Sequence, residues 1–120
     1  DGETVHVVVR RSLDDPAVLA LPASVVAHRH DGSTAAMCAI VGAAQPNVVA
    51  HLASRFVVEH RPDDVEPLVR DNLLFGAQLL EGVRSAAVRR LVNIGSAFQH
   101  HRDAEYSPTS LYAPPSPTVQ

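Results

Sequence analysis

Short apolar runs alternate with polar turns and helical patterns along most of the chain. The β-branched run at residues 5–9, bounded by Gly2 and a polar Arg-Arg-Ser cluster, predicts a buried strand. Similar short runs predict further strands at residues 25–28, 48–53 and 91–94. The chain therefore carries four strand signals separated by longer segments.

The segments between these runs carry helix signals. Residues 33–42 predict a helix, with the hydroxyl of Ser33 or Thr34 as N-cap and with Pro46 preventing its continuation. Residues 68–83 predict a long amphipathic helix after a proline-containing loop, and residues 14–20 predict a weaker one.

Some polar positions of these elements are expected to face solvent. On the long helix, Arg70 and Asp71 lie outside the predicted apolar stripe, which includes Leu73, Leu74, Leu79 and Leu80. His28 and His30 alternate along the second strand, and we expect them at an exposed edge.

Strands that alternate with helices predict an α/β fold with a largely parallel sheet and right-handed crossovers. Ligands of such sheets gather beyond the carboxyl ends of the strands. The residues that follow the predicted strands are Arg10 and Arg11, Asp31 and Gly32, Leu52 to Ser54, and Gly95 and Ser96.

These residue types suit a dinucleotide. Asp31 could accept a hydrogen bond from an adenine amino group or a ribose, and Gly32 lets a backbone approach closely. The small side chains of Ala53 and Ser54 leave room for a flat ligand. Arg10 or its neighbour could pair with a ribose 2′-phosphate, which would favour NADP over NAD.

Composition narrows the other possibilities. A chain of 120 residues with a net charge of −3 fits one domain and shows no basic footprint for nucleic acid or membrane. One cysteine excludes an intrachain disulfide and fits the cytoplasm. Seven histidines show no His-x-x-x-His helix pair, so we expect no metal.

Four stretches together resemble the extended short-chain dehydrogenase/reductase family, which includes NAD-dependent epimerases and dehydratases of nucleotide sugars. They are residues 48–54 (VVAHLAS), 72–81 (NLLFGAQLLE), 91–96 (LVNIGS) and 107–113 (SPTSLYA). The resemblance implies an NAD(P)-binding Rossmann-like sheet with helices on both faces.

The resemblance also implies roles for individual residues. Contacts to the cofactor, NAD or NADP, fall on Asp31, Gly32, Leu52, Ala53, Ser54 and Asn72. The family's catalytic Ser or Thr falls on Ser96, and its general acid/base tyrosine falls on Tyr112. A nucleotide-sugar-like substrate is the implied partner.

The chain departs from the family at two points. The family's first strand and glycine-rich phosphate loop, which should precede the run at residues 5–9, are not found, so the sheet is expected to be incomplete. The family's lysine four residues after Tyr112 is replaced by Ser116, and the chain contains no lysine.

We therefore expect residues 5–113 to form a partial NAD(P)-binding Rossmann domain and residues 114–120 to be a disordered tail. We expect the chain to be a fragment of such an enzyme, with little or no catalytic activity. The alternative is a non-catalytic α/β module that self-associates through an exposed sheet edge, giving a homo-oligomer.

Overall fold

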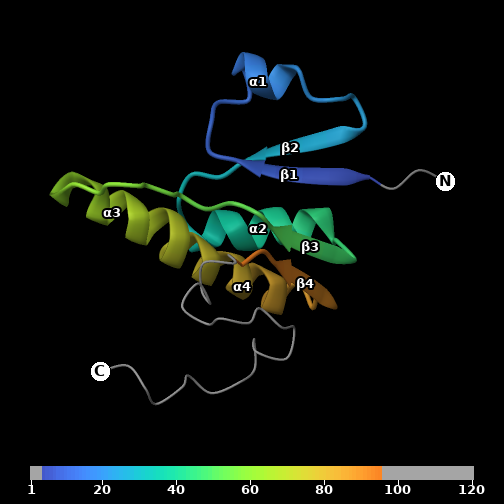
Figure 1. The fold of residues 1–120 in the computed structure, drawn as a ribbon. Helices are drawn as coiled ribbons and strands as arrows, with labels where there is room; N and C mark the ends of the chain where they lie inside the picture. The colour runs from blue at the N-terminus through green and yellow to red at the C-terminus, as the bar shows by residue number, and fades with distance from the viewer. Residues whose placement is uncertain (1–3, 96–120) are drawn as a thin grey trace, which may run out of the picture.

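The computed structural model describes residues 4–95 (Figure 1). Strands and helices form where the sequence pattern predicts them. Its elements are, in chain order, β1 (Val5–Val9), α1 (Pro16–Leu19), β2 (Val25–Arg29), α2 (Thr34–Ala44), β3 (Val48–His51), η1 (Pro62–Asp64), α3 (Val65–Leu68), η2 (Val69–Leu74), α4 (Phe75–Ser85) and β4 (Arg90–Asn93).

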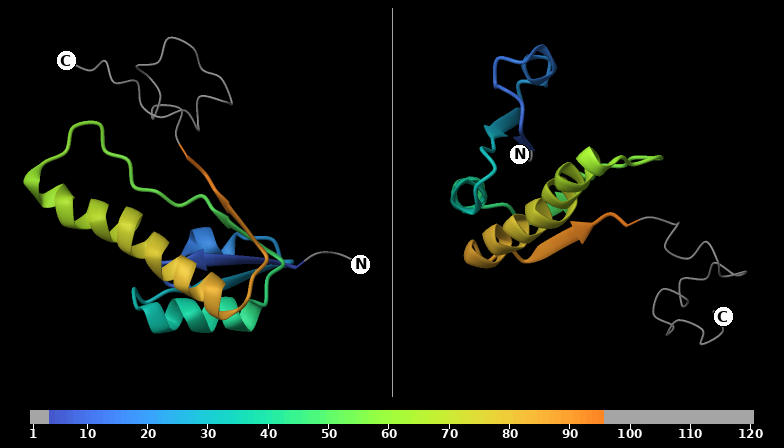
Figure 2. Two further views of the ribbon diagram at one scale, coloured as in Figure 1. Left: turned by 90° about the horizontal axis from the view of Figure 1, so that it is seen from below. Right: turned by 90° about the vertical axis from the view of Figure 1, so that its left-hand side faces the viewer.

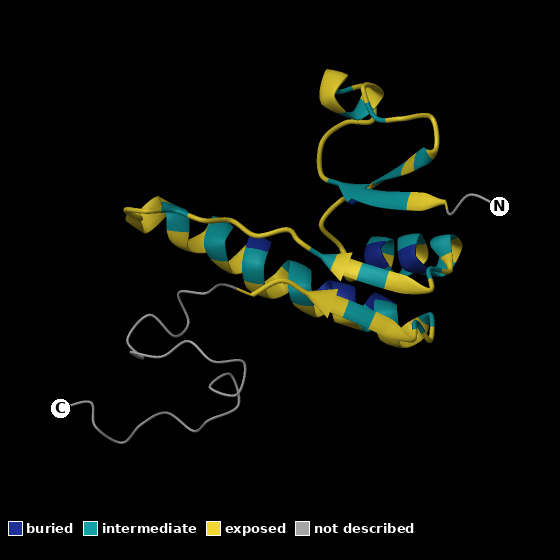
Figure 3. Cartoon of the chain, turned by 45° about the vertical axis from the view of Figure 1, so that its right-hand side comes forward, coloured by how far each residue is buried: buried dark blue, intermediate teal, exposed yellow. Residues whose placement is uncertain are grey.

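The four strands form two parallel pairs. β1 pairs with β2, with Val5 opposite Val25, and β3 pairs with β4, with Val48 opposite Arg90. Among residues 4–95, no backbone hydrogen bond joins one pair to the other. The arrowheads of β1, β3 and β4 point the same way (Figure 3). The parallel α/β prediction is confirmed, in the form of an incomplete Rossmann-like fold.

Helix α2 begins and ends at the residues whose chemistry favours those positions. The Ser33 hydroxyl accepts a hydrogen bond from the backbone N–H of Ala36 at 3.1 Å, which caps the first turn. Gln45 ends the helix in the left-handed conformation, with φ of 44°, and its side-chain amide donates to the Gly42 carbonyl at 2.7 Å. Pro46 then directs the chain into β3.

Helices α2 and α4 pack closely beside each other (Figure 2). Gly82 permits this approach, because a Cβ atom there would lie 3.1 Å from Val41 Cγ2 and 3.3 Å from the Met37 carbonyl oxygen. Met37, Val41 and Leu79 form the buried core, and Val8, Val49 and Leu91 of the strands pack on it. Both long helices therefore cover the same side of the strands.

The long helix differs from the predicted regular one by a π-helical segment, η2, between α3 and α4. Its apolar stripe is also less buried than predicted. Leu79 is buried, but Leu73, Leu74 and Leu80 are exposed, because no described segment covers their side of the helix.

Three residues that were expected to face solvent do not. His30 is 4% exposed, because its ring packs edge-on against Phe75 and shares a hydrogen bond with the Ser33 carbonyl at 3.1 Å. Asp71 is 9% exposed, because arginine side chains surround it. His28 is half-buried beside His6 rather than at an exposed edge.

The described part of the chain is unusually open for a folded domain. Among residues 4–95, fifteen Val, Leu, Ile and Phe side chains are exposed, whereas three apolar side chains are buried (Figure 3). None of the helices in residues 4–95 combines the length and apolar character that a bilayer span requires. The fold therefore presents apolar surface that a further layer of structure could cover.

Candidate functional site

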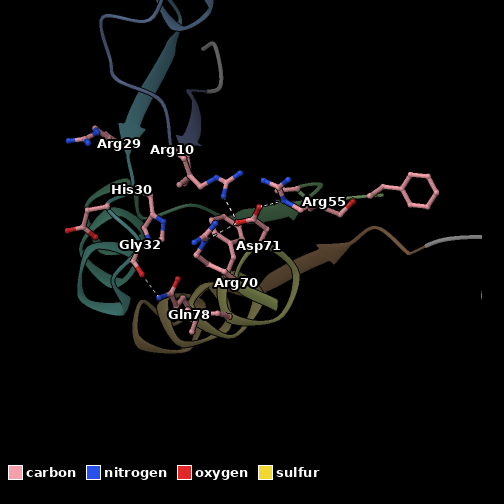
Figure 4. A pocket seen from close by; sticks show the side chains of 15 residues that line it. Arg10, Arg29, His30, Gly32, Arg55, Arg70, Asp71 and Gln78 are labelled. Atoms are coloured by element: carbon pink, nitrogen blue, oxygen red, sulfur yellow. Dashed lines mark hydrogen bonds and ion pairs between the residues drawn. The ribbon is translucent and has the colours of Figure 1, made fainter. Parts of the chain in front are cut away.

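A pocket of about 660 Å³ lies beyond the carboxyl ends of β1, β2 and β3, beside η2 and the start of α4 (Figure 4). This is where ligands of open parallel sheets are expected. The lining comprises Val8, Arg10, Arg29, His30, Asp31, Gly32, Ala53, Ser54, Arg55, Phe56, Arg70, Asp71, Leu74, Phe75 and Gln78. Three loops far apart in the sequence thus meet at one concave surface.

Asp71 is the centre of the charged side of this pocket. One of its carboxylate oxygens accepts a hydrogen bond from Arg10, and the other accepts one from Arg55 Nε at 2.6 Å. Its side chain is 7% exposed. The Arg55 hydrogen bond, together with the positive charge of Arg10, holds the pKa of Asp71 below its ordinary value despite burial, so the carboxylate is charged at neutral pH.

The cluster around Asp71 carries more positive than negative charge. Arg70 Nε lies 3.6 Å from the same carboxylate, so three guanidinium groups face one carboxylate, a formal excess of two positive charges. Arg10 is 56% exposed and keeps donors free toward the pocket. Such a cluster suits a phosphate-bearing ligand.

The π-helical segment positions this cluster. Asp71 and Asn72 both lie in η2, and π segments inside helices are frequent at functional sites. The Asn72 side chain accepts a hydrogen bond from the backbone N–H of Arg55 at 2.7 Å and donates one to the Arg55 carbonyl at 2.9 Å. The two adjacent residues therefore hold both the backbone and the guanidinium of Arg55.

The loop between β2 and α2 forms the opposite side of the pocket. Asp31 accepts a hydrogen bond from the Ser33 backbone N–H at 2.8 Å, and this bond is the main cause that lowers the pKa of Asp31. Gly32 has a φ of 97°, which side chains rarely tolerate. Gln78, buried on α4, donates to the Gly32 carbonyl at 2.7 Å and fixes the loop on the helix.

His30 contributes a buried acceptor to the same side. Its Nε2 lies 3.1 Å from the Ser33 carbonyl and must donate there, which leaves Nδ1 as an acceptor. Within residues 4–95, Nδ1 has no hydrogen-bond partner. The donors and acceptors of the pocket thus fit a ligand that combines phosphates with an amino-bearing base, as a dinucleotide does.

The pocket brings together five of the seven residues predicted to bind cofactor. They are Arg10, Asp31, Gly32, Ala53 and Ser54. Leu52 lies instead in a neighbouring groove between β1 and β3. Asn72 is outside the lining, where it binds the backbone of Arg55.

The remaining predicted residues are placed elsewhere. Arg11 points to the surface and pairs with Asp15 at 3.2 Å, so of the two adjacent arginines only Arg10 lines the pocket. Ser96 and Tyr112 lie outside the described residues.

Sequence reasoning missed Asp71, Arg55, Gln78 and His30 as parts of the site. One signal was present for Asp71: arginines follow two strand ends, and guanidinium groups brought near each other favour a carboxylate between them. No comparable sequence signal indicates the Gln78 hydrogen bond, since this bond depends on how α4 packs against the β2–α2 loop.

The pocket and the parallel strands agree with comparison to known families. The model of the NAD dependent epimerase/dehydratase family matches residues 1–119. No curated protein and no solved structure matches the chain. Because the family match spans nearly all of its length, the chain belongs to the NAD-dependent epimerase/dehydratase family.

Proposed function

We propose that this chain forms the dinucleotide-binding part of a cytoplasmic NAD(P)-dependent epimerase, dehydratase or reductase that acts on a nucleotide sugar or a similar hydroxylated substrate. The observation that carries the proposal is the convergence of three strand-end loops on one pocket beside an arginine cluster. The family match supports the use of NAD or NADP.

The residues present fit such a cofactor. Arg10 would bind the ribose 2′-phosphate of NADP, and the other arginines of the cluster would bind the pyrophosphate, while Asp31 would accept a hydrogen bond from the ribose or adenine. Ala53 and Ser54 leave the floor of the pocket free of bulk. When bound, the dinucleotide supplies hydride transfer, and this chain supplies its binding and orientation.

The proposed catalytic residues are Ser96 and Tyr112. A tyrosine needs a lowered pKa to act as a base at neutral pH, since its ordinary pKa is about 10. With Ser116 where the family has lysine, no neighbouring lysine charge is supplied. We expect no turnover of UDP-sugars by the purified chain, measured by NADH or NADPH absorbance, and measurable turnover would contradict this.

Dinucleotide affinity tests the proposal directly. The 2′-phosphate of NADP should pair with Arg10, so the chain should bind NADP more tightly than NAD in calorimetry. Arg10→Gln should weaken NADP binding about tenfold, as expected for one partly exposed charge-assisted hydrogen bond, and leave NAD binding nearly unchanged.

Arg89→Gln is the matched control, because Arg89 is an exposed arginine outside the pocket. It should leave both affinities unchanged. Equal losses of NADP affinity in the two variants would show that the effect comes from the overall charge of the protein. This result would contradict a specific role for Arg10.

A second candidate function is self-association through the sheet. The exposed apolar side chains and the unjoined strand pairs favour it. Light scattering would then show a mass that rises with protein concentration and does not respond to NAD or NADP. A constant monomer mass would contradict it.

A further inference from the structure

Asp71 holds Arg10 and Arg55 in different ways (Figure 4). Arg55 is fixed both by Asp71, which accepts from its Nε at 2.6 Å, and by Asn72, which binds its backbone N–H and carbonyl at 2.7 and 2.9 Å. Among residues 4–95, the Arg10 side chain donates only to Asp71, and it is 56% exposed. Arg55 is therefore fixed in place, whereas a single partner keeps Arg10 at the carboxylate.

Loss of Arg10 would not leave the Asp71 carboxylate unpaired. The Asp71 side chain is 7% exposed, so an uncompensated charge there would be strongly unfavourable. Arg55 would keep its hydrogen bond to one carboxylate oxygen, and Arg70 Nε lies 3.6 Å from the other. Because two guanidinium groups would still face the carboxylate, Arg10 can move to another anion without stranding a buried charge.

The pocket is the place where Arg10 would meet such an anion. Arg10 and Asp71 both line it, and its charged side carries more arginines than carboxylates. Carboxylate and phosphate oxygens accept the same charge-assisted, often bidentate hydrogen bonds from a guanidinium group. A ligand phosphate that reaches Arg10 must therefore displace Asp71 from it.

We infer that Asp71 is an internal anion that competes with the phosphate of a ligand for Arg10, and that it thereby sets how tightly the pocket binds this phosphate. The inference rests on the proposed function, because it takes the ribose 2′-phosphate of NADP as the competing anion. Binding breaks the hydrogen bond between Arg10 and Asp71 and forms one between Arg10 and the phosphate. The net gain is therefore smaller than an arginine without a carboxylate partner would give.

An asparagine at position 71 would separate the two arginines. Its single side-chain oxygen can still accept from Arg55, which Asn72 holds in place. Its amide N–H group cannot accept from Arg10, and the negative charge that attracts Arg10 is lost. Arg10 would then be available to the phosphate from the start.

Calorimetric titration with adenosine 2′-phosphate tests the competition, with adenosine as the matched ligand that lacks the phosphate. Asp71→Asn should bind adenosine 2′-phosphate about tenfold more tightly than the wild type, because one charge-assisted hydrogen bond no longer has to be broken. Adenosine affinity should be unchanged. Glu81→Gln is the control: it removes a negative charge that pairs with Arg84 outside the pocket, and both affinities should equal those of the wild type.

Arg10→Gln distinguishes competition for Arg10 from the general field of the carboxylate. The gain from Asp71→Asn should disappear when Arg10→Gln is already present, because the two residues act as a coupled pair. An equal gain in both backgrounds would overturn the inference, since Asp71 would then repel the phosphate through space. Weaker binding of both ligands by Asp71→Asn would indicate a purely structural role and would overturn it too.

A measurement on the wild type does not depend on the folding of a variant. At neutral pH, the carbon-13 NMR signal of the Asp71 side-chain carboxyl should shift with adenosine 2′-phosphate, because Arg10 leaves it, and should not shift with adenosine. An unmoved signal at saturation would overturn the inference.

Failure of the inference and failure of the proposed function give different results. Binding of adenosine 2′-phosphate that Arg10→Gln weakens, without a gain in Asp71→Asn, would overturn the competition and leave the dinucleotide site standing. Absence of binding by either ligand would contradict both.

Discussion

Asp71 pairs with three arginines of the pocket, and Asp71→Asn removes its charge with little change in size. The wild-type carboxylate, 7% exposed, accepts hydrogen bonds from Arg10 and Arg55, which are 56% and 38% exposed. Each charge-assisted hydrogen bond contributes about 1.5–3 kcal/mol when well shielded. Because the two arginines are partly exposed, water screens their charges and can hydrate them, which lowers the contribution of each hydrogen bond to about 1 kcal/mol.

The substitution should therefore reduce the free energy of unfolding by about 2 kcal/mol at pH 7, roughly a thirtyfold change in the folding equilibrium. In urea denaturation followed by circular dichroism, the midpoint should fall by about 1–2 M with an unchanged slope. Glu81→Gln is the matched control: its carboxylate pairs with Arg84 on the exposed face of α4, so its midpoint should equal that of the wild type.

The pH dependence identifies the charge as the cause. The pKa of Asp71 lies below its ordinary value of 3.8 in the folded state, so its stabilising contribution is present above pH 3.8 and is lost as the pH falls through the folded pKa. Wild type and Asp71→Asn should converge below pH 3.8. A difference that persists unchanged to lower pH, or a variant as stable as Glu81→Gln at pH 7, would show that the charge of Asp71 does not stabilise the fold.

Three further substitutions test other parts of the fold. Burial, and then the neighbouring His6, lower the pKa of His28 below 6.5, so wild-type stability should fall as the pH drops from 7 to 5. In urea titrations the stability of His28→Gln should fall less over the same pH range. Equal falls in the two proteins would contradict this role of His28. Gly82→Ala should lower the free energy of unfolding by about 1 kcal/mol, measured by urea denaturation, because of the tight contact between α2 and α4. In Gly76→Ala the new Cβ would meet nothing closer than 3.7 Å, so the higher helix propensity of alanine should raise the free energy of unfolding by about 0.5–1 kcal/mol. A loss as large as that of Gly82→Ala would contradict the role of the close contact between α2 and α4.

The sequence sufficed for the elements and their direction. The β-branched runs at β1 and β3 favour strands by their own propensity. Ser33 caps the start of α2 and Pro46 prevents its continuation, so the bounds of this helix follow from neighbouring residues. These signals lie within a few neighbouring residues, so they predict the elements without knowledge of the tertiary structure. The same holds for the strand-end positions of Arg10, Asp31 and Ala53, which parallel topology brings to one pocket.

What the sequence did not predict depends on contacts between distant segments. Asp71 is solvated in an isolated helix and becomes buried only because Arg10 and Arg55 arrive from two strand ends. His30 is likewise covered by Phe75, 45 positions further along the chain. Leu73 and Leu80 show the opposite error, since they were expected to be buried and are exposed. Amphipathic periodicity indicates an apolar helix face, but it does not show which segment covers that face.

A two-dimensional NMR titration of the labelled chain with NADP shows whether the carboxyl-end pocket binds a dinucleotide. Progressive shifts are expected for the amides of Gly32, Ala53 and Ser54, with a dissociation constant on the order of millimolar, because the described residues that line the pocket include no glycine-rich loop to donate backbone N–H groups. Asn47, at the amino end of β3, should not move. Shifts confined to the amino ends of the strands, or no shifts at roughly ten times that concentration, would contradict it.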